Sequence, residues 1–416
     1  MATSVSGVGS ITSTGLGSGL NVTDILDRLM AVEQRPLELL KTAGGALSTR
    51  LSNVGKLQGL FSTLRDKANV LTAPTLWSAT TATSADTSAV KVATGTNAVA
   101  GSYAVQVDRL ATGQTVTAAA LPSASSTLGA GQLTIELGSW NGGDALTPPT
   151  GFTAKPGASP VSITIGAGDT SLSAIRDKIN AAGAGVTATL VTDATGTRLS
   201  LRSRETGAEN AFRVSVDAAG AGSGLGALAY DATDAAAPMQ RSTSAANAAL
   251  SVNGIALSAA SNTLTDVVDG LTLTLVKPTT AAVDVAVASD TASVKTAVTD
   301  FVAAFNSLAS FIRTQTAYNA DSKTAGALQG DQSTLALQSQ LRGVLNEAST
   351  ASSTWSRLSE VGLTLKADGT LDTNATKLDN ALGNLGELKK LMAGDAGTTA
   401  GMGFVRRFVE SMQWNR

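Results

Sequence analysis

The sequence of 416 residues contains no cysteine and no histidine. Without cysteine the chain has no disulfide, no thiolate nucleophile and no cysteine-bound zinc. Without histidine it lacks the commonest general base and the commonest metal ligand of proteins. An enzyme built from this chain would need a Ser-Lys pair or a carboxylate site, because its many hydroxyls have no ordinary activating base. We therefore expect neither catalysis nor a cofactor.

Charge and long apolar stretches are also scarce. Charged residues make up 15% of the chain and the net charge is −2, which argues against a nucleic-acid partner, since such proteins carry basic patches. No run of 18 apolar residues is present, so we expect no membrane span. The start MATSVSGVGSITS lacks the basic region and apolar stretch of a cleaved secretory signal. These features predict a cytoplasmic protein, or one exported by a route that reads an uncleaved N-terminus.

The stretch GLGSGLNVTDILDRLMAVEQRPLELL, residues 15–40, predicts an amphipathic helix near the start of the chain. Asn21 can cap this helix, with Asp24 as its capping-box partner. We expect Pro36 to kink or restart the helix and Gly44-Gly45 to separate it from the next helix. Its apolar face consists of Val22, Ile25, Leu26, Leu29 and Met30.

Two later segments carry apolar residues at alternating spacings of three and four, which is the heptad pattern of helices that pair. They span residues 47–71 and 294–312, and neither helix can bury its stripe alone. The simplest arrangement that buries both stripes pairs the two helices with each other. The seam consists of Leu47, Leu51, Val54 and Phe61 in the first helix and Val294, Val298, Phe301, Phe305 and Leu308 in the second.

Between these helices the pattern changes to the alternation typical of strands. Asn253-Gly254 is the preferred two-residue hairpin turn and is flanked by alternating apolar residues. One amphipathic helix, capped at Asp169 or Thr170, interrupts the strands. We expect strands from 80–110 and 245–290 to form one sheet around an inserted domain.

The sequence thus predicts an α+β multidomain fold, with a helical terminal segment, a helical-bundle leg and a β-rich head of two nested domains. The expected divisions are a flexible segment with an amphipathic helix at 1–44, the leg at 45–79 and 290–416, a head domain at 80–115 and 241–289, and an inserted head domain with one helix at 116–240.

Motifs that suggest a ligand are weak. Asp368, Gly369 and Asp372 resemble part of a calcium loop, but the repeated ligands and the closing glutamate are missing, so a hairpin turn is favoured. Arg202 and Arg204 could hold an anion, although a solvated strand end is favoured.

The opening stretch, the segment GVTATLVTDATGTRLSLRSRETGAENAF, the hairpin sequence LSVNGIALS and the segment GLTLKADGTLDTN occur together and in order. In this arrangement the chain resembles the flagellar filament capping proteins, also called the hook-associated protein 2 family. Asn21 stands where the family commonly has aspartate. Family members usually continue past a segment like GMGFVRRF into a charged coiled coil and an amphipathic helix, whereas this sequence ends at Arg416. The resemblance implies that the opening helix lacks its C-terminal mate.

The resemblance implies a structural role at the distal tip of the bacterial flagellum, where a homo-oligomeric ring promotes folding and insertion of exported flagellin. The implied partners are copies of the chain itself, flagellin, hook-filament junction proteins, the flagellar export apparatus and an export chaperone. The chain would be secreted without a cleaved signal peptide. Val22, Ile25, Leu26, Leu29 and Met30 would then contact neighbouring subunits or the filament, and order only on assembly. The alternative is an adhesin-like surface module that binds through the β-rich head.

Overall fold

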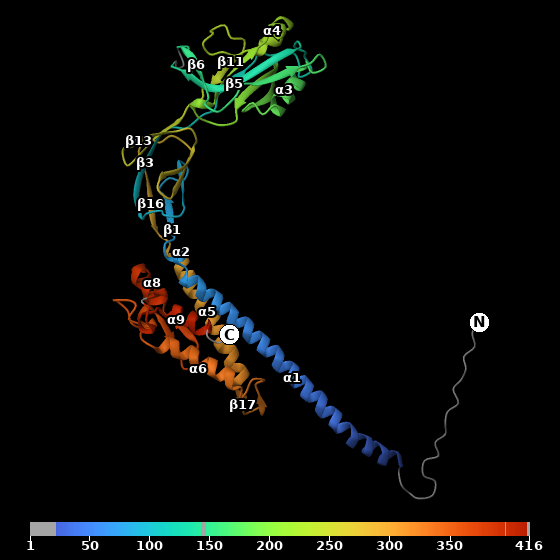
Figure 1. Ribbon diagram of the computed structural model, residues 1–416, viewed down its shortest axis with the longest axis vertical. Coiled ribbons are helices and arrows are strands. Elements are labelled where there is room, and N and C mark those ends of the chain that lie inside the picture. The colour runs from blue at the N-terminus through green and yellow to red at the C-terminus, as the bar shows by residue number, and fades with distance from the viewer. Residues whose placement is uncertain (1–21, 143–146, 396, 414–416) are drawn as a thin grey trace, which may run out of the picture. The chain divides into compact units, whose positions relative to one another are not determined.

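The computed structural model describes residues 22–142, 147–395 and 397–413. These residues fold into two compact units, one from 22–77 with 291–413 and the other from 78–290. Helices dominate the first unit and strands the second (Figure 1). The predicted α+β multidomain fold is therefore confirmed.

The helix α1 (Val22–Thr72) runs through the first unit as one helix of 51 residues. The predicted restart at Pro36 and the predicted break at Gly44-Gly45 are therefore wrong. Pro36 removes one backbone hydrogen bond, but this part of α1 is exposed, so water can reach the freed carbonyl. Each helical glycine costs about 1 kcal/mol relative to alanine, which the helix-forming residues around the pair offset. The predicted cap Asn21 lies outside the described residues.

The second half of α1 packs against α5 (Thr291–Thr316) and forms the core of the first unit. Leu64, Ala68 and Leu71 of α1 are completely buried there. The predicted pairing of these two helices is confirmed for this half of α1. Further helices of the unit are α2 (Pro74–Trp77), α6 (Gln332–Asn346), α7 (Ala375–Leu382), α8 (Leu385–Ala393) and α9 (Phe404–Gln413).

Two short hairpins complete the first unit, β17 (Tyr318–Asn319) with β18 (Thr324–Ala325) and β19 (Leu363–Leu365) with β20 (Leu371–Thr373). In the second hairpin, Asp368 accepts hydrogen bonds from the backbone N–H of Thr370 at 3.0 Å and from its hydroxyl at 2.6 Å. This contact is the turn chemistry that the sequence favours over a calcium loop. Among the described residues, no group of three or more acidic side chains could hold a metal ion.

The second unit contains two nested cores. The first core lies between a five-stranded and a three-stranded antiparallel sheet, so the prediction of one sheet from 80–110 and 245–290 is wrong. The alternation of apolar and polar residues along a strand shows which side chains are buried, but it does not show which strands pair. The strand orders are β1 (Thr80–Ser84), β16 (Val283–Ser289), β3 (Gly101–Arg109), β12 (Ala248–Val252), β13 (Ile255–Ala259) in the larger sheet and β14 (Thr263–Val268), β15 (Leu271–Leu275), β2 (Val90–Thr94) in the smaller.

The second core belongs to the inserted part of the unit. Its helix α3 (Leu172–Ala181) is capped by Ser171, whose hydroxyl accepts from the N–H of Ala174, rather than by Asp169 or Thr170. A short helix α4 (Ala218–Ser223) comes later in the chain. One sheet has the order β11 (Gln240–Thr243), β4 (Thr115–Thr117), β9 (Gly196–Ser203), β8 (Val186–Asp193), and in the other β5 (Gly131–Asn141) pairs with β10 (Ala211–Val216), β6 (Gly151–Ala154) and β7 (Val161–Ile165).

The hairpin predicted at Asn253-Gly254 is confirmed between β12 and β13. Both turn residues have positive φ, 51° for Asn253 and 80° for Gly254. Asparagine and glycine tolerate this left-handed backbone better than other residues, which is why the dipeptide marks such turns. No helix among the described residues has the length and apolar character needed to cross a membrane.

Candidate functional site

An apolar stripe lies exposed along the N-terminal half of α1. Its side chains are between 45% and 72% exposed, an unusual state for large apolar residues that recur at helical spacing. We call it the exposed stripe, and its members are Ile25, Leu26, Leu29, Met30, Leu37, Leu40, Leu47 and Leu51. Four of the five contact residues predicted from the sequence belong to it, while the side chain of Val22 lies outside the described residues.

The length of α5 explains why the stripe is exposed. At 1.5 Å per residue, the 51 residues of α1 extend over about 76 Å, while the 26 residues of α5 extend over about 39 Å. The partner helix can therefore cover only about half of α1. Burial of α1 begins with the half-buried Val54, continues with the partly buried Leu57 and Leu60, and becomes complete at Leu64.

The predicted seam is consequently shorter than its heptad spacing indicates. Leu47 and Leu51 are 69% and 72% exposed, so their predicted burial against the second helix is wrong. Val54 is half-buried, and Phe61 packs against the core. On α5 the predicted seam residues Val294, Val298, Phe301, Phe305 and Leu308 are all buried in the same core.

Sequence reasoning missed the contribution of α9 to this core. Phe404, Val405 and Phe408 of α9 are at most 1% exposed and pack with α1 and α5. The segment FVRRFVESM carries apolar residues at spacings of three and four, which is a signal that could have identified this helix.

Ion pairs fix the middle and the C-terminal part of α1 to the rest of the first unit. Arg50 contacts Asp331 at 2.7 Å, and Lys67 contacts Asp300 at 2.7 Å. The backbone N–H of Thr334 and the Arg50 guanidinium hold the pKa of Asp331 below its usual value. Closer to the N-terminus, Arg28 pairs with Asp24 at 3.5 Å within α1 itself. Such exposed pairs contribute little to stability, but they orient the helix.

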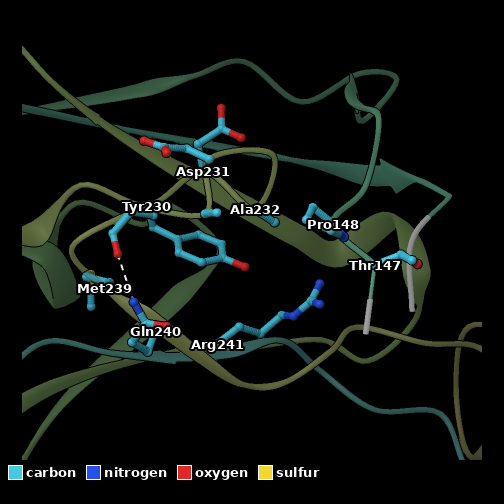
Figure 2. A pocket seen from close by; sticks show the side chains of 11 residues that line it. Thr147, Pro148, Tyr230, Asp231, Ala232, Met239, Gln240 and Arg241 are labelled. Atoms are coloured by element: carbon cyan, nitrogen blue, oxygen red, sulfur yellow. Dashed lines mark hydrogen bonds between the residues drawn. The ribbon is translucent and has the colours of Figure 1, made fainter. Parts of the chain in front are cut away.

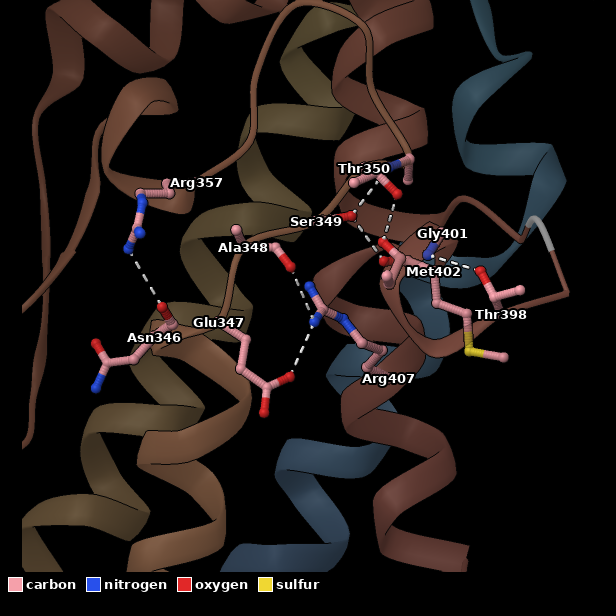
Figure 3. Close-up of polar contacts among 12 residues, drawn as sticks. Asn346, Glu347, Ala348, Ser349, Thr350, Arg357, Thr398, Gly401, Met402 and Arg407 are labelled. Atoms are coloured by element: carbon pink, nitrogen blue, oxygen red, sulfur yellow. Dashed lines mark hydrogen bonds and ion pairs between the residues drawn. The ribbon is translucent and has the colours of Figure 1, made fainter.

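A polar network around Arg407 holds α9 in place (Figure 3). The Arg407 guanidinium donates to the carboxylate of Glu347 at 3.1 Å and to the carbonyl of Ala348 at 3.3 Å. It also lies over the ring of Phe404, with 4.7 Å from the guanidinium carbon to the ring centroid. Burial lowers the pKa of Arg407, and the charge of Glu347 opposes this effect. The network connects the segment after α6 to α9, and so supports the core that anchors α1.

Family models match most of the chain. The model described as the flagellar hook-associated protein 2 N-terminus matches residues 18–114, and its C-terminal counterpart matches residues 245–413. Between them, residues 150–205 match the flagellin hook IN motif. The matches therefore cover both units and part of the inserted region.

Individual relatives agree with the family models. The chain is 34% identical over 385 residues to flagellar hook-associated protein 2 of Escherichia coli K12, covering 90% of this chain and 78% of that protein. It is 32% identical over 387 residues to the B-type protein of Pseudomonas aeruginosa, covering 89% and 77%. The crystal structure of the D1-D2-D3 domains of the Escherichia coli flagellar cap protein FliD superposes with a TM-score of 0.66 at 33% identity, covering 88% of this chain and 96% of that one. The chain belongs to the flagellar hook-associated protein 2 family, whose members are structural capping proteins of the flagellar filament.

Proposed function

We propose that this chain assembles with copies of itself into a ring at the distal tip of the flagellum, and that the exposed stripe contacts neighbouring subunits and flagellin. The observation that carries this proposal is the row of half-exposed leucines and methionine along the N-terminal half of α1. Covering each of these side chains would contribute about 1 kcal/mol, since full burial of such a side chain contributes roughly 1.5–3 kcal/mol.

The spacing of the stripe suits a helical partner. Its residues recur at spacings of three, four and seven, so they form one face of α1 and can enter the groove between side chains of another amphipathic helix. A single helix without such a partner is marginally stable in water, because nucleation is costly. Assembly would therefore both bury the stripe and stabilise the helix that carries it.

The remaining partners are those of the family. We propose that the chain is exported unfolded without a cleaved signal peptide, through the flagellar export apparatus and with an export chaperone. At the tip it would adjoin hook-filament junction proteins and flagellin. The absence of cysteine suits a chain that passes through export unfolded. We further propose that its role is structural and not enzymatic, in keeping with the absence of histidine.

The proposal is tested by placing a charge in the exposed stripe. In Leu29→Asp, assembly would remove water from a carboxylate that has no partner at the contact, which is costly. We expect this variant to lose ring formation in size-exclusion chromatography with light scattering. In a deletion strain complemented with it, we expect unpolymerised flagellin in the medium and reduced motility.

The matched control is Ala31→Asp, which adds the same charge two residues away on the opposite face of α1. This variant should assemble and support motility as the wild type does. Normal rings and filament growth with Leu29→Asp, or equal defects in both variants, would show that the exposed stripe is not part of the assembly surface.

A further inference from the structure

The strand β13 (Ile255–Ala259) forms one edge of the five-stranded sheet in the second unit. It pairs with β12 over its whole length and without a register shift, and within the described chain no strand pairs with its other side. Natural proteins protect such edges with charges, bulges or a covering element, because the free N–H and C=O groups of an edge strand pair readily with another chain. An edge without this protection is a surface on which a further strand can add to the sheet.

Other edge strands of the second unit are protected. At β8 the side-chain amide of Asn180 donates to the carbonyl of Ala188 at 2.9 Å and accepts from its N–H at 2.8 Å, so the amide takes the place of a neighbouring strand. The pairing of β14 shifts register between Thr265 and Val268. The pairing of β11 also shifts register, and this strand carries the charge of Arg241 beside the pocket shown in Figure 2.

The edge at β13 is uncharged, regular and exposed. The chain has no charged residue and no proline from position 242 to 265, a stretch that contains the whole hairpin of β12 and β13. Ile255 lies opposite the buried Val252, so both side chains point to the same face of the sheet, yet Ile255 is 67% exposed. The apolar face of the sheet is therefore uncovered at this edge.

The turn between β12 and β13 determines which backbone groups of β13 are free. Val252 and Ile255 flank this two-residue turn and form a hydrogen-bonded pair, and such pairs alternate along an antiparallel ladder. Every second residue from Ile255 thus bonds to β12, whereas Ala256 and Ser258 direct their N–H and C=O groups to the free edge. Both residues are exposed, so these groups are accessible to another strand.

We propose that β13 pairs with β13 of a second copy of this chain, antiparallel and around a two-fold axis at Leu257. In this register Ala256 of each copy lies opposite Ser258 of the other, and each such pair exchanges both backbone hydrogen bonds. Ile255 lies opposite the small Ala259, and no like charges meet.

The uncharged sequence of β13 is complementary to itself, which is why a second copy is assigned to this edge. A two-fold contact, in which the same surface is used on both subunits, is also the commonest in homo-oligomers. The contact lies in the second unit and does not involve the exposed stripe. It is therefore independent of the proposed ring.

A single cysteine tests the pairing, because the chain has no cysteine of its own. At the two-fold axis Leu257 faces its counterpart in a non-hydrogen-bonded pair, where Cα atoms lie about 4.5 Å apart, a separation that a disulfide can span. We expect Leu257→Cys to form a disulfide-linked dimer in glutathione redox buffer, measured by non-reducing gel electrophoresis. Every variant also carries Leu29→Asp, so that ring formation through the exposed stripe does not bring the copies together.

Ser258→Cys is the matched control. Ser258 is more exposed than Leu257, so random collisions would link it faster, but in the proposed register it faces Ala256 and not its own counterpart. We expect Leu257→Cys to cross-link about tenfold faster than Ser258→Cys or more, because pairing raises the effective concentration of the two thiols. Equal rates, or faster linkage of Ser258→Cys, would overturn the proposal.

Ala256→Lys added to Leu257→Cys should abolish the cross-link, because a charge on an edge strand opposes pairing. Ala256→Ser is the neutral control and should cross-link as before, and melting by circular dichroism checks that each variant is folded. Sedimentation equilibrium gives a second measurement without cysteine. There the chain with its natural β13 should form a concentration-dependent dimer that Ala256→Lys removes. A cross-link or a dimer that is unchanged by Ala256→Lys contradicts the pairing of the two strands, and so does the absence of any dimer in the chain with its natural β13.

Discussion

The ring of Phe408 on α9 stands edge-on against the ring of Phe301 on α5, with 5.8 Å between the centroids and 88° between the planes. Both rings are completely or almost completely buried. The pair joins α5 to a helix near the end of the sequence, within the core that holds the C-terminal half of α1. Edge-on aromatic pairs contribute about 0.5–1.5 kcal/mol beyond the burial of their area.

Phe301→Ala should therefore lower the free energy of unfolding of the first unit by about 3–5 kcal/mol, because it leaves a cavity and removes the aromatic contact. Thermal and denaturant unfolding measure this loss. The matched control is Phe311→Ala on the same helix, where the ring is only half-buried, and it should cost clearly less. Equal melting of Phe301→Ala and wild type would contradict the assignment of this core.

The spacing of apolar residues predicted which faces of the helices and strands are apolar better than it predicted which elements cover those faces. Phe301 and Leu51 occupy equivalent positions in heptad seams, yet Phe301 is buried and Leu51 is exposed. The spacing is the same in both, and only the length of α5 decides which half of α1 is covered. The Asn253-Gly254 turn was predictable because its signal is contained in two adjacent residues.

The pairing of strands in the first core of the second unit had no comparable signal. Alternation of apolar residues indicated which side chains are buried but not which strands pair, so the division into a five-stranded and a three-stranded sheet could not be predicted.

Arg407→Met should leave the first unit at least as stable as the wild type. The side chain of Arg407 is 5% exposed, and its Nε and Nη2 atoms have no hydrogen-bond partner within the described chain. Replacing a buried and incompletely paired cation with an apolar side chain of similar length is often neutral or stabilising. Arg406→Met is the control, and it should change stability by less than about 1 kcal/mol because its ion pairs are exposed. A large loss with Arg407→Met, measured by urea unfolding, would show that the network in Figure 3 depends on the charge.

Glu387 should make the first unit sensitive to acid. Hydrogen bonds from Lys390, Ser352 and the backbone of Ser353 lower its pKa from 4.5 to about 2. As the pH falls below about 4.5, the unfolded chain takes up a proton at this position while the folded chain does not, so stability decreases until the pH reaches about 2. In Glu387→Gln this part of the pH dependence should disappear, although the variant should be less stable than wild type at neutral pH. Unfolding by urea at several pH values measures the difference, and parallel pH profiles would contradict the prediction.

Residues 78–290 should fold without the rest of the chain. This unit contains its own two cores, and its first and last strands, β1 and β16, pair with each other. A fragment of these residues should be soluble and should melt cooperatively by circular dichroism. Narrow amide dispersion in its NMR spectrum would mean that the second unit requires the helical one.

Amide exchange along α1 should separate its two halves in the dilute, unassembled protein. Residues 57–72 pack into the core of the first unit, so their amides can exchange only when that core opens. The side chains of residues 24–51 are exposed, and the contact of Arg50 with Asp331 lies at the C-terminal end of this segment. A helix with so few tertiary contacts opens easily, because few bonds compensate its ordering. We therefore expect fast exchange in peptides from 24–51 and slow exchange in peptides from 57–72 by mass spectrometry, with peptides from α5 as the protected reference.

Assembly should slow exchange in 24–51 in the wild type and in Ala31→Asp, but not in Leu29→Asp, because a carboxylate in the exposed stripe must lose its water without gaining a partner. Equal protection of both halves before assembly would mean that the stripe is already covered, and then its contact with other subunits could not stabilise the helix.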